Sequence, residues 1–255
     1  MDIRREILRN IILCQALAPT GRRAGGKWRE QMPEGPKLEH LIVAGVNSSW
    51  QFYDLADRVL TAGRQPDSIF DLAYEAQKAS LRNLSADRVN FRPVQLLVPL
   101  VTAQVLDYME TGTHEDVESM IERTGEVLRN STERDVESFI HLGHVTPARQ
   151  SARFDRTSAR SEPVPARRGR YRSVWEAAQD FQAVHSVREM IDGYPFSQQV
   201  YRFLLHNVES GILPATELIY QFLFPEIGRA DVTADLIVVG LYLMLTKHPE
   251  GLLFI

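Results

Sequence analysis

Apolar residues recur at intervals of three and four along most of this chain, which is the spacing that gathers them on one face of an α-helix. In the opening segment, 2–18, the pattern is carried by residues such as Ile3, Ile7 and Ile11. Pro19 and the glycines after it break helices, so the pattern predicts that the first helix ends there.

Four of the later amphipathic segments follow or contain a residue that favours a helix start. Asp67, Thr113 and Ser131 have side chains that cap helices, and Pro93 suits the first turn of one. The helices predicted in this way cover residues 38–59, 69–84, 94–109, 117–128, 136–142, 173–192, 196–210, 215–224 and 231–247. No segment alternates convincingly with a period of two. The sequence therefore predicts an all-α fold, a compact bundle of about nine to ten helices without significant sheet, in a single domain over residues 1–255.

The most apolar stretch, residues 236–245, is about half as long as the roughly 20 residues that a membrane span needs. Asp235 and Lys247 flank it, so it is predicted to be a buried core helix and the protein is expected to have no membrane partner. The lone Cys14 excludes an internal disulfide, and the charged start resembles a helix more than a signal peptide. These features favour a cytoplasmic protein.

Residues 145–172 lack the periodic apolar pattern and are rich in arginine, serine and proline, so they are predicted to form a flexible surface loop. Four arginines, spaced by four, three and four, would make a basic stripe if the segment became helical: Arg149, Arg153, Arg156 and Arg160. Such a stripe could contact a polyphosphate or a nucleic acid. Nucleic acid is the less favoured partner, because the rest of the chain is acidic.

The segment from Gly21 to Trp28 has the spacing G-x-x-x-x-G-K, in which backbone amides and a lysine cradle phosphates. A true loop of this kind is disfavoured, because Trp28 stands where Ser or Thr must hold magnesium and a helix, not a strand, comes before it. Arg22, Arg23 and Lys27 in a glycine-rich loop could still bind phosphate by charge. A solvated turn is the alternative interpretation.

Two further clusters leave alternatives open. His185, Arg188 and Glu189 would share one helix face, either as acid/base groups or as a salt-bridged surface, and we favour the surface. Carboxylates beside Thr132, such as Asp135, either complement the positive end of a helix or hold magnesium for a nucleoside triphosphate.

Six segments occur in the order expected for the triphosphoribosyl-dephospho-CoA synthase family, and together they make the chain resemble that family. They are residues 16–21 (ALAPTG), 39–42 (EHLI), 90–103 (NFRPVQLLVPLVTA), 132–136 (TERDV), 186–195 (SVREMIDGYP) and 243–253 (LMLTKHPEGLL). Enzymes of this family are all-helical and transfer the ribosyl triphosphate of ATP to dephospho-CoA, with loss of adenine. The resemblance thus implies a (triphospho)ribosyl transferase with ATP or a related nucleotide, a CoA-like acceptor and Mg²⁺.

The polar motifs of that family are only partly retained. Its Lys-Pro-Gly is replaced by residues 19–22 (PTGR), and of its Asn-Thr motif only Asn90 remains. The chain is therefore expected to be a divergent transferase acting on ATP and a nucleotide or phosphorylated acceptor. The alternative is a non-catalytic nucleotide-binding or protein-interaction scaffold, and a homodimer is left open.

The site expected from these residues has three parts. Asp135 and Asn90 are the candidate catalytic residues, and Asp135 is also the candidate magnesium ligand. The candidate nucleotide contacts are Arg22, Arg23, Lys27, Arg92 and Thr132. The enzyme hypothesis requires these side chains to converge on one pocket, whereas the scaffold hypothesis scatters them over the surface.

Overall fold

The computed structural model describes residues 2–24, 38–82, 91–113, 117–144, 170–182, 184–207, 212, 215, 216, 218, 219 and 230–248. This part of the chain is helical and contains no strand, which confirms the predicted all-α fold. Its ten bounded helices are α1 (Ile3–Ala24), α3 (Leu38–Ala62), α4 (Phe70–Ser80), α5 (Phe91–Thr111), α6 (Val117–Arg129), α7 (Glu133–His144), α9 (Val174–Asp180), α10 (His185–Ile191), α11 (Pro195–Asn207) and α14 (Ala230–Lys247).

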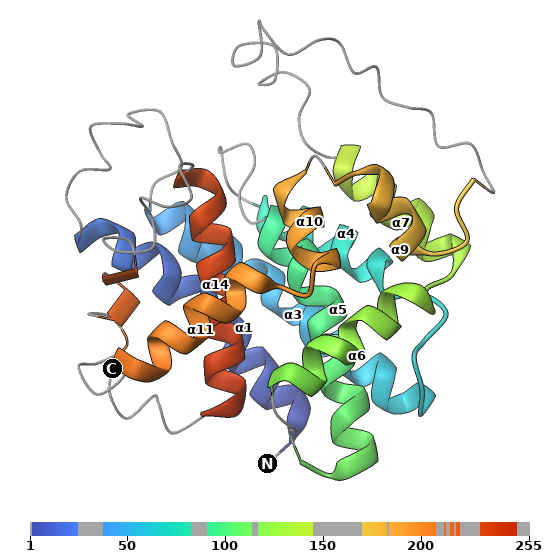
Figure 1. Ribbon diagram of the computed structural model, residues 1–255, viewed down its shortest axis with the longest axis horizontal. Coiled ribbons are helices and arrows are strands. Elements are labelled where there is room, and N and C mark those ends of the chain that lie inside the picture. The colour runs from blue at the N-terminus through green and yellow to red at the C-terminus, as the bar shows by residue number, and fades with distance from the viewer. Residues whose placement is uncertain are drawn as a thin grey trace, which may run out of the picture.

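Helix α5 lies at the centre of the bundle (Figure 1), and every residue from 93 to 107 in it is buried. On one side, α1 packs against both α3 and α14, and α11 covers α14. On the other side, α6 packs against α5, α4 packs against α7, and α9 contacts α6 and α7. The apolar faces predicted from the sequence therefore meet around α5.

The apolar stretch 236–245 is a buried helix, as predicted. It lies within α14, and all of its residues are buried, with Tyr242 fully enclosed. None of the helices in the described ranges is both long and apolar enough to cross a membrane.

The predicted end of the first helix is wrong. Helix α1 continues through Pro19 to Ala24, so Arg22 and Arg23 belong to its last turn and not to a glycine-rich loop. A proline within a helix removes one backbone donor, but Leu17 and Ala18, the two residues before Pro19, are buried in the core. Burial of the apolar face against α3 and α14 outweighs the lost hydrogen bond.

The helix predicted over residues 173–192 is two helices, α9 and α10. The break is held by short backbone bonds, from Phe181 N–H to Ala178 O at 3.0 Å and from Val184 N–H to Phe181 O at 2.9 Å. No glycine or proline marks this break in the sequence. Most of the predicted loop 145–172, with its four spaced arginines, lies outside the described residues, as does much of the predicted helix 215–224.

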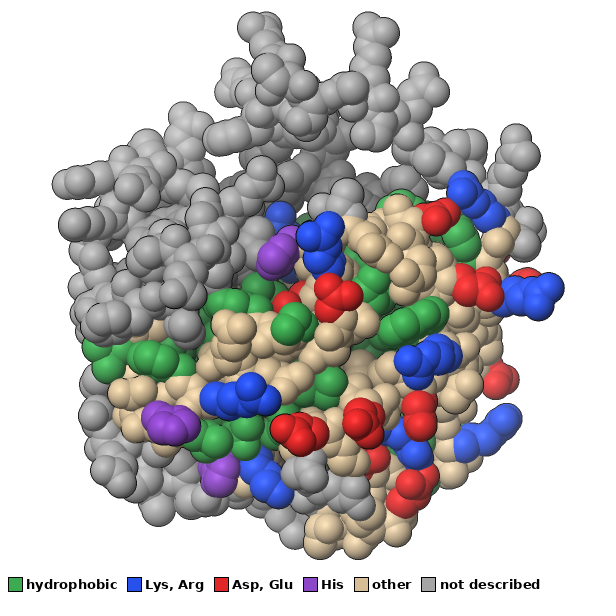
Figure 2. All heavy atoms as spheres, viewed as in Figure 1, with side chains coloured by type: hydrophobic (Ala, Val, Ile, Leu, Met, Phe, Trp, Pro, Cys, Tyr) green, Lys and Arg blue, Asp and Glu red, His purple; other side chains and the backbone are tan. Residues whose placement is uncertain are grey.

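Acidic and basic side chains are interspersed on the face drawn in Figure 2, where the described residues form no extended patch of one sign. A phosphate backbone needs several adjacent cations. This part of the surface therefore gives no support to nucleic-acid binding.

Candidate functional site

The structure describes the side chains of three of the seven predicted site residues: Arg92, Thr132 and Asp135. Asn90 and Lys27 lie outside the described residues, and Arg22 and Arg23 are placed by their backbone alone. The described part of the expected site therefore lies at the starts of α5 and α7 and, through Asp135, of α4.

Thr132 and Asp135 form a reciprocal cap at the start of α7. The Asp135 backbone N–H donates to Thr132 Oγ1, and the Thr132 N–H donates to Asp135 Oδ2, each over 3.4 Å. The start predicted at Ser131 is therefore one residue early. The Ser131 hydroxyl accepts a 2.7 Å hydrogen bond from Val174 N–H at the start of α9.

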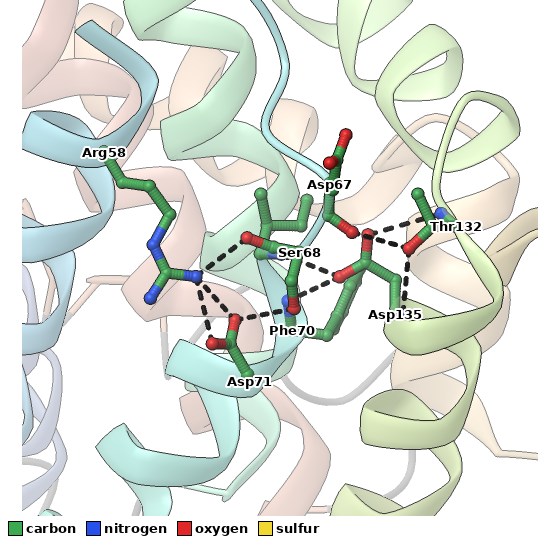
Figure 3. A network of polar contacts seen from close by, with 8 residues as sticks. Arg58, Asp67, Ser68, Phe70, Asp71, Thr132 and Asp135 are labelled. Atoms are coloured by element: carbon green, nitrogen blue, oxygen red, sulfur yellow. Dashed lines mark hydrogen bonds and ion pairs between the residues drawn. The ribbon is translucent and has the colours of Figure 1, made fainter. Parts of the chain in front are cut away.

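Asp135 also caps a second helix, α4 (Figure 3). Its Oδ1 accepts the N–H of Ile69 at 2.7 Å and of Phe70 at 2.9 Å, while Thr132 Oγ1 donates to Asp67 O at 2.6 Å. The predicted cap, Asp67, contributes only this carbonyl to the network, and its side chain is 86% exposed. Thr132 and Asp135, at the start of α7, thus close the start of α4.

A neighbouring ion pair extends this network to α3. Arg58 Nη1 donates to Asp71 Oδ1 at 2.7 Å and to Ser68 O at 2.8 Å, and Ser68 Oγ donates to the same carboxylate at 2.9 Å. Burial alone would raise the pKa of Asp71, but the hydrogen bonds from Arg58 and Ser68 outweigh it and lower that pKa. No sequence pattern identified this pair, because 13 residues separate its members.

The position of Asp135 favours a structural role. Its side chain is 0% exposed, and burial raises its pKa although the N–H groups of Phe70 and Ile69 act in the opposite direction. Both carboxylate oxygens already accept backbone N–H groups. The residues described include no group of three or more His, Cys, Asp or Glu side chains that could hold a metal ion. The surroundings of Asp135 therefore do not fit a magnesium ligand.

Arg92 lies in a different polar group, at the start of α5. Its Nη1 pairs with Asp235 Oδ2 of α14 at 3.4 Å, and these side chains are 33% and 23% exposed. Figure 1 places the N-terminal ends of α5 and α14 and the C-terminal end of α1 in its upper half. The sequence identified Asp235 only as a charge that flanks the apolar stretch 236–245. Its pairing with Arg92 could not be predicted, because 143 residues separate the two. The structure joins Thr132 with Asp135, and Arg92 with Asp235.

Glu189 is a second buried carboxylate that caps a neighbouring helix, so the predicted salt-bridged surface is wrong at this residue. It is 4% exposed, and its Oε1 accepts the N–H of Ser197 at 2.7 Å and the Ser197 hydroxyl at 2.9 Å. These contacts close the start of α11. Burial raises the pKa of Glu189 above its ordinary value of 4.5.

Replacing Glu189 by glutamine should flatten the dependence of Tm on pH. Because the folded-state pKa is raised, the folded chain binds this proton more tightly, and the resulting stability is lost as pH rises from about 4.5 through the raised pKa. Glutamine cannot ionise, yet its carbonyl can still accept from Ser197. Thermal unfolding across this pH window measures the effect, with Glu122→Gln as the exposed control. Equal slopes for wild type and Glu189→Gln would contradict it.

Two of the segments that carry the family resemblance contact each other in the fold. Ser186 Oγ donates to Gln95 Oε1 at 3.1 Å, and the hydroxyl of Tyr194 donates to Leu96 O at 2.8 Å. Tyr194 is fully buried and has a positive φ of 57°, in the turn between α10 and α11. This turn is therefore anchored to the N-terminal half of α5, next to Arg92.

Comparison with known proteins adds no relative. The sequence matches no known family profile, and no characterised protein or solved structure gives a significant match.

Proposed function

We propose that this chain is a divergent relative of the triphosphoribosyl-dephospho-CoA synthases that binds the phosphates of ATP or a related nucleotide at the start of α5. The acceptor of the transferred (triphospho)ribosyl group would be a nucleotide or phosphorylated small molecule, such as a CoA-like compound. The observation that carries the proposal is the position of Arg92, beside Asp235 and in the first turn of a 21-residue helix.

Arg92 has the chemistry that a phosphate contact needs. A guanidinium presents five donors in a planar fork that matches phosphate oxygens, and the N-terminal end of α5 adds the positive end of the helix dipole. The Asp235 carboxylate, 3.4 Å away, orients the side chain without enclosing it, because a third of it is exposed. Negative charge on a triphosphate would be stabilised at this position.

The resemblance supports the same location. Arg92 lies in the segment 90–103, and residues of the segment 186–195 pack directly on that part of α5. Asn90, which precedes Arg92, would add an amide to the site, and Arg22, Arg23 and Lys27 would contribute further cations from the end of α1 and the segment after it. No step of the proposal relies on magnesium at Asp135.

The second candidate function is a non-catalytic nucleotide-binding or protein-interaction scaffold. One observation favours it: Thr132 and Asp135, the polar residues of the segment 132–136 that carries part of the resemblance, hold the starts of α4 and α7. A chain that keeps such residues for folding alone would retain the helices and lose the chemistry.

Replacing Arg92 by alanine should weaken nucleotide binding about tenfold or more without unfolding the protein, because a charge-assisted contact to phosphate contributes about 1.5–3 kcal/mol. A thermal-shift screen with ATP, dephospho-CoA and related nucleotides, with and without magnesium, selects the ligand. Calorimetric titration then compares wild type with Arg92→Ala. Arg202→Ala is the matched control, since this arginine of α11 is 60% exposed.

The outcomes separate the two functions. Equal affinity of Arg92→Ala and wild type would remove Arg92 from the site. Failure of the wild type to bind any nucleotide would contradict the transferase and leave the protein-interaction scaffold as the better explanation.

A further inference from the structure

A cluster of buried polar side chains lies between α1, α5 and α14, helices that pack against one another in the core. Its centre is Tyr242 of α14, which is 0% exposed and donates its hydroxyl hydrogen to Gln104 Oε1 of α5. Burial raises the pKa of Tyr242, and the nearby Cys14 thiol and Glu6 carboxylate of α1 add to this effect. Three helices thus direct polar groups into one apolar region.

Two amide groups of this cluster have no hydrogen-bond partner among the described residues. They are Nδ2 of Asn10, on a side chain that is 0% exposed, and Nε2 of Gln104, on one that is 1% exposed. Asn10 lies midway between Glu6 and Cys14 on the same face of α1, because residues four apart share a face. It is therefore directed towards the region of Tyr242.

The hydrogen bonds of the two amide oxygens, Asn10 Oδ1 and Gln104 Oε1, fix the orientation of both amides. Asn10 Oδ1 accepts from Arg9 Nε at 3.1 Å and from Arg9 Nη2 at 3.0 Å, so Nδ2 is the atom that faces inward. Gln104 Oε1 accepts from Tyr242, which leaves Nε2 as the second donor. A buried N–H without an acceptor is strongly unfavourable, and native proteins satisfy nearly all such groups with protein or ordered water.

We propose that the region between α1, α5 and α14 is a binding site for an uncharged, oxygen-bearing ligand, of which water is the smallest, that accepts hydrogen bonds from Asn10 and Gln104. A cation cannot accept from an N–H group. An anion would be repelled by the buried Glu6 carboxylate near Tyr242. A neutral hydroxyl or carbonyl oxygen can accept these hydrogen bonds and carries no negative charge. The proposed site is independent of any nucleotide bound at Arg92.

A high-resolution crystal structure of the full chain tests this directly. We expect electron density within hydrogen-bonding distance of Asn10 Nδ2 and Gln104 Nε2, and an empty space at both atoms would overturn the proposal. Native mass spectrometry distinguishes the source: a mass above that of the chain indicates a retained organic molecule, and the mass of the chain alone, with density present, indicates water.

The variant Asn10→Leu has nearly the same shape but lacks both the Nδ2 donor and the Oδ1 that accepts from Arg9. Loss of a bound oxygen should lower Tm by about 2–4 °C for each hydrogen bond lost, and the density beside Asn10 should vanish. A rise in Tm would overturn the proposal, because it would mean that the wild-type amide is buried without a ligand. Thr102→Val is the matched control: Thr102 is 0% exposed on α5 and donates within its own helix, to Val98 O at 2.9 Å, so the density should remain.

Discussion

Replacing Gly240 by alanine is expected to destabilise the protein by about 2 kcal/mol, and so to lower Tm by about 4–8 °C. A Cβ at this position of α14 would lie 2.3 Å from Val200 Cγ1 and 3.0 Å from Ser197 O of α11. Val200 is 0% exposed and β-branched, and a backbone carbonyl cannot rotate aside. The two helices would have to move apart, which exposes part of the most apolar segment of the chain.

Gly125→Ala is the matched control for this substitution. The nearest atoms to a Cβ there belong to the flexible end of Arg129, at 3.4 Å or more, so alanine should stabilise α6 by up to about 1 kcal/mol. The double variant Gly240→Ala with Val200→Ala should recover part of the loss, because the two sites share one contact. Thermal and denaturant unfolding measure all three. A Gly240→Ala protein as stable as the wild type would contradict the close approach of α11 and α14.

The helices could be predicted from the sequence because their signal is local. The apolar residues of α14 form a pattern that can be recognised along the chain, and the predicted start of α7 at Ser131 is only one residue from the Thr132–Asp135 cap. The end of α1 could not be predicted, because the burial of Leu17 and Ala18 depends on α3 and α14. Pro19 and the glycines after it therefore predicted the wrong C-terminal end for α1.

The roles of the site residues depend on contacts between distant parts of the chain. Asp135 Oδ1 accepts hydrogen bonds from backbone N–H groups 65 and 66 residues away. Nearly every residue type has such a group, so the sequence does not reveal these partners. Arg92 and Asp235 are further apart still. Sequence reasoning selected Asp135 and Arg92 as polar residues of interest, but only the fold separates a helix cap from a candidate phosphate contact.

Replacing Asp135 by alanine is expected to cost about 3 kcal/mol or more of stability. The change leaves the N–H groups of Ile69 and Phe70 buried without an acceptor, and it also removes the reciprocal cap with Thr132. Asp135→Asn is the matched control, since its amide oxygen can still accept both N–H groups, and it should stay close to wild type.

Hydrogen exchange gives the readout that identifies the mechanism. The amides of Ile69 and Phe70 should exchange much faster in Asp135→Ala, because the start of α4 opens locally, and they should remain protected in Asp135→Asn. Magnesium should change neither result, because both oxygens of Asp135 are already engaged by backbone donors. Unchanged stability and exchange in Asp135→Ala, together with loss of magnesium-dependent nucleotide binding, would instead make this carboxylate a metal ligand and place the chemistry at the start of α7.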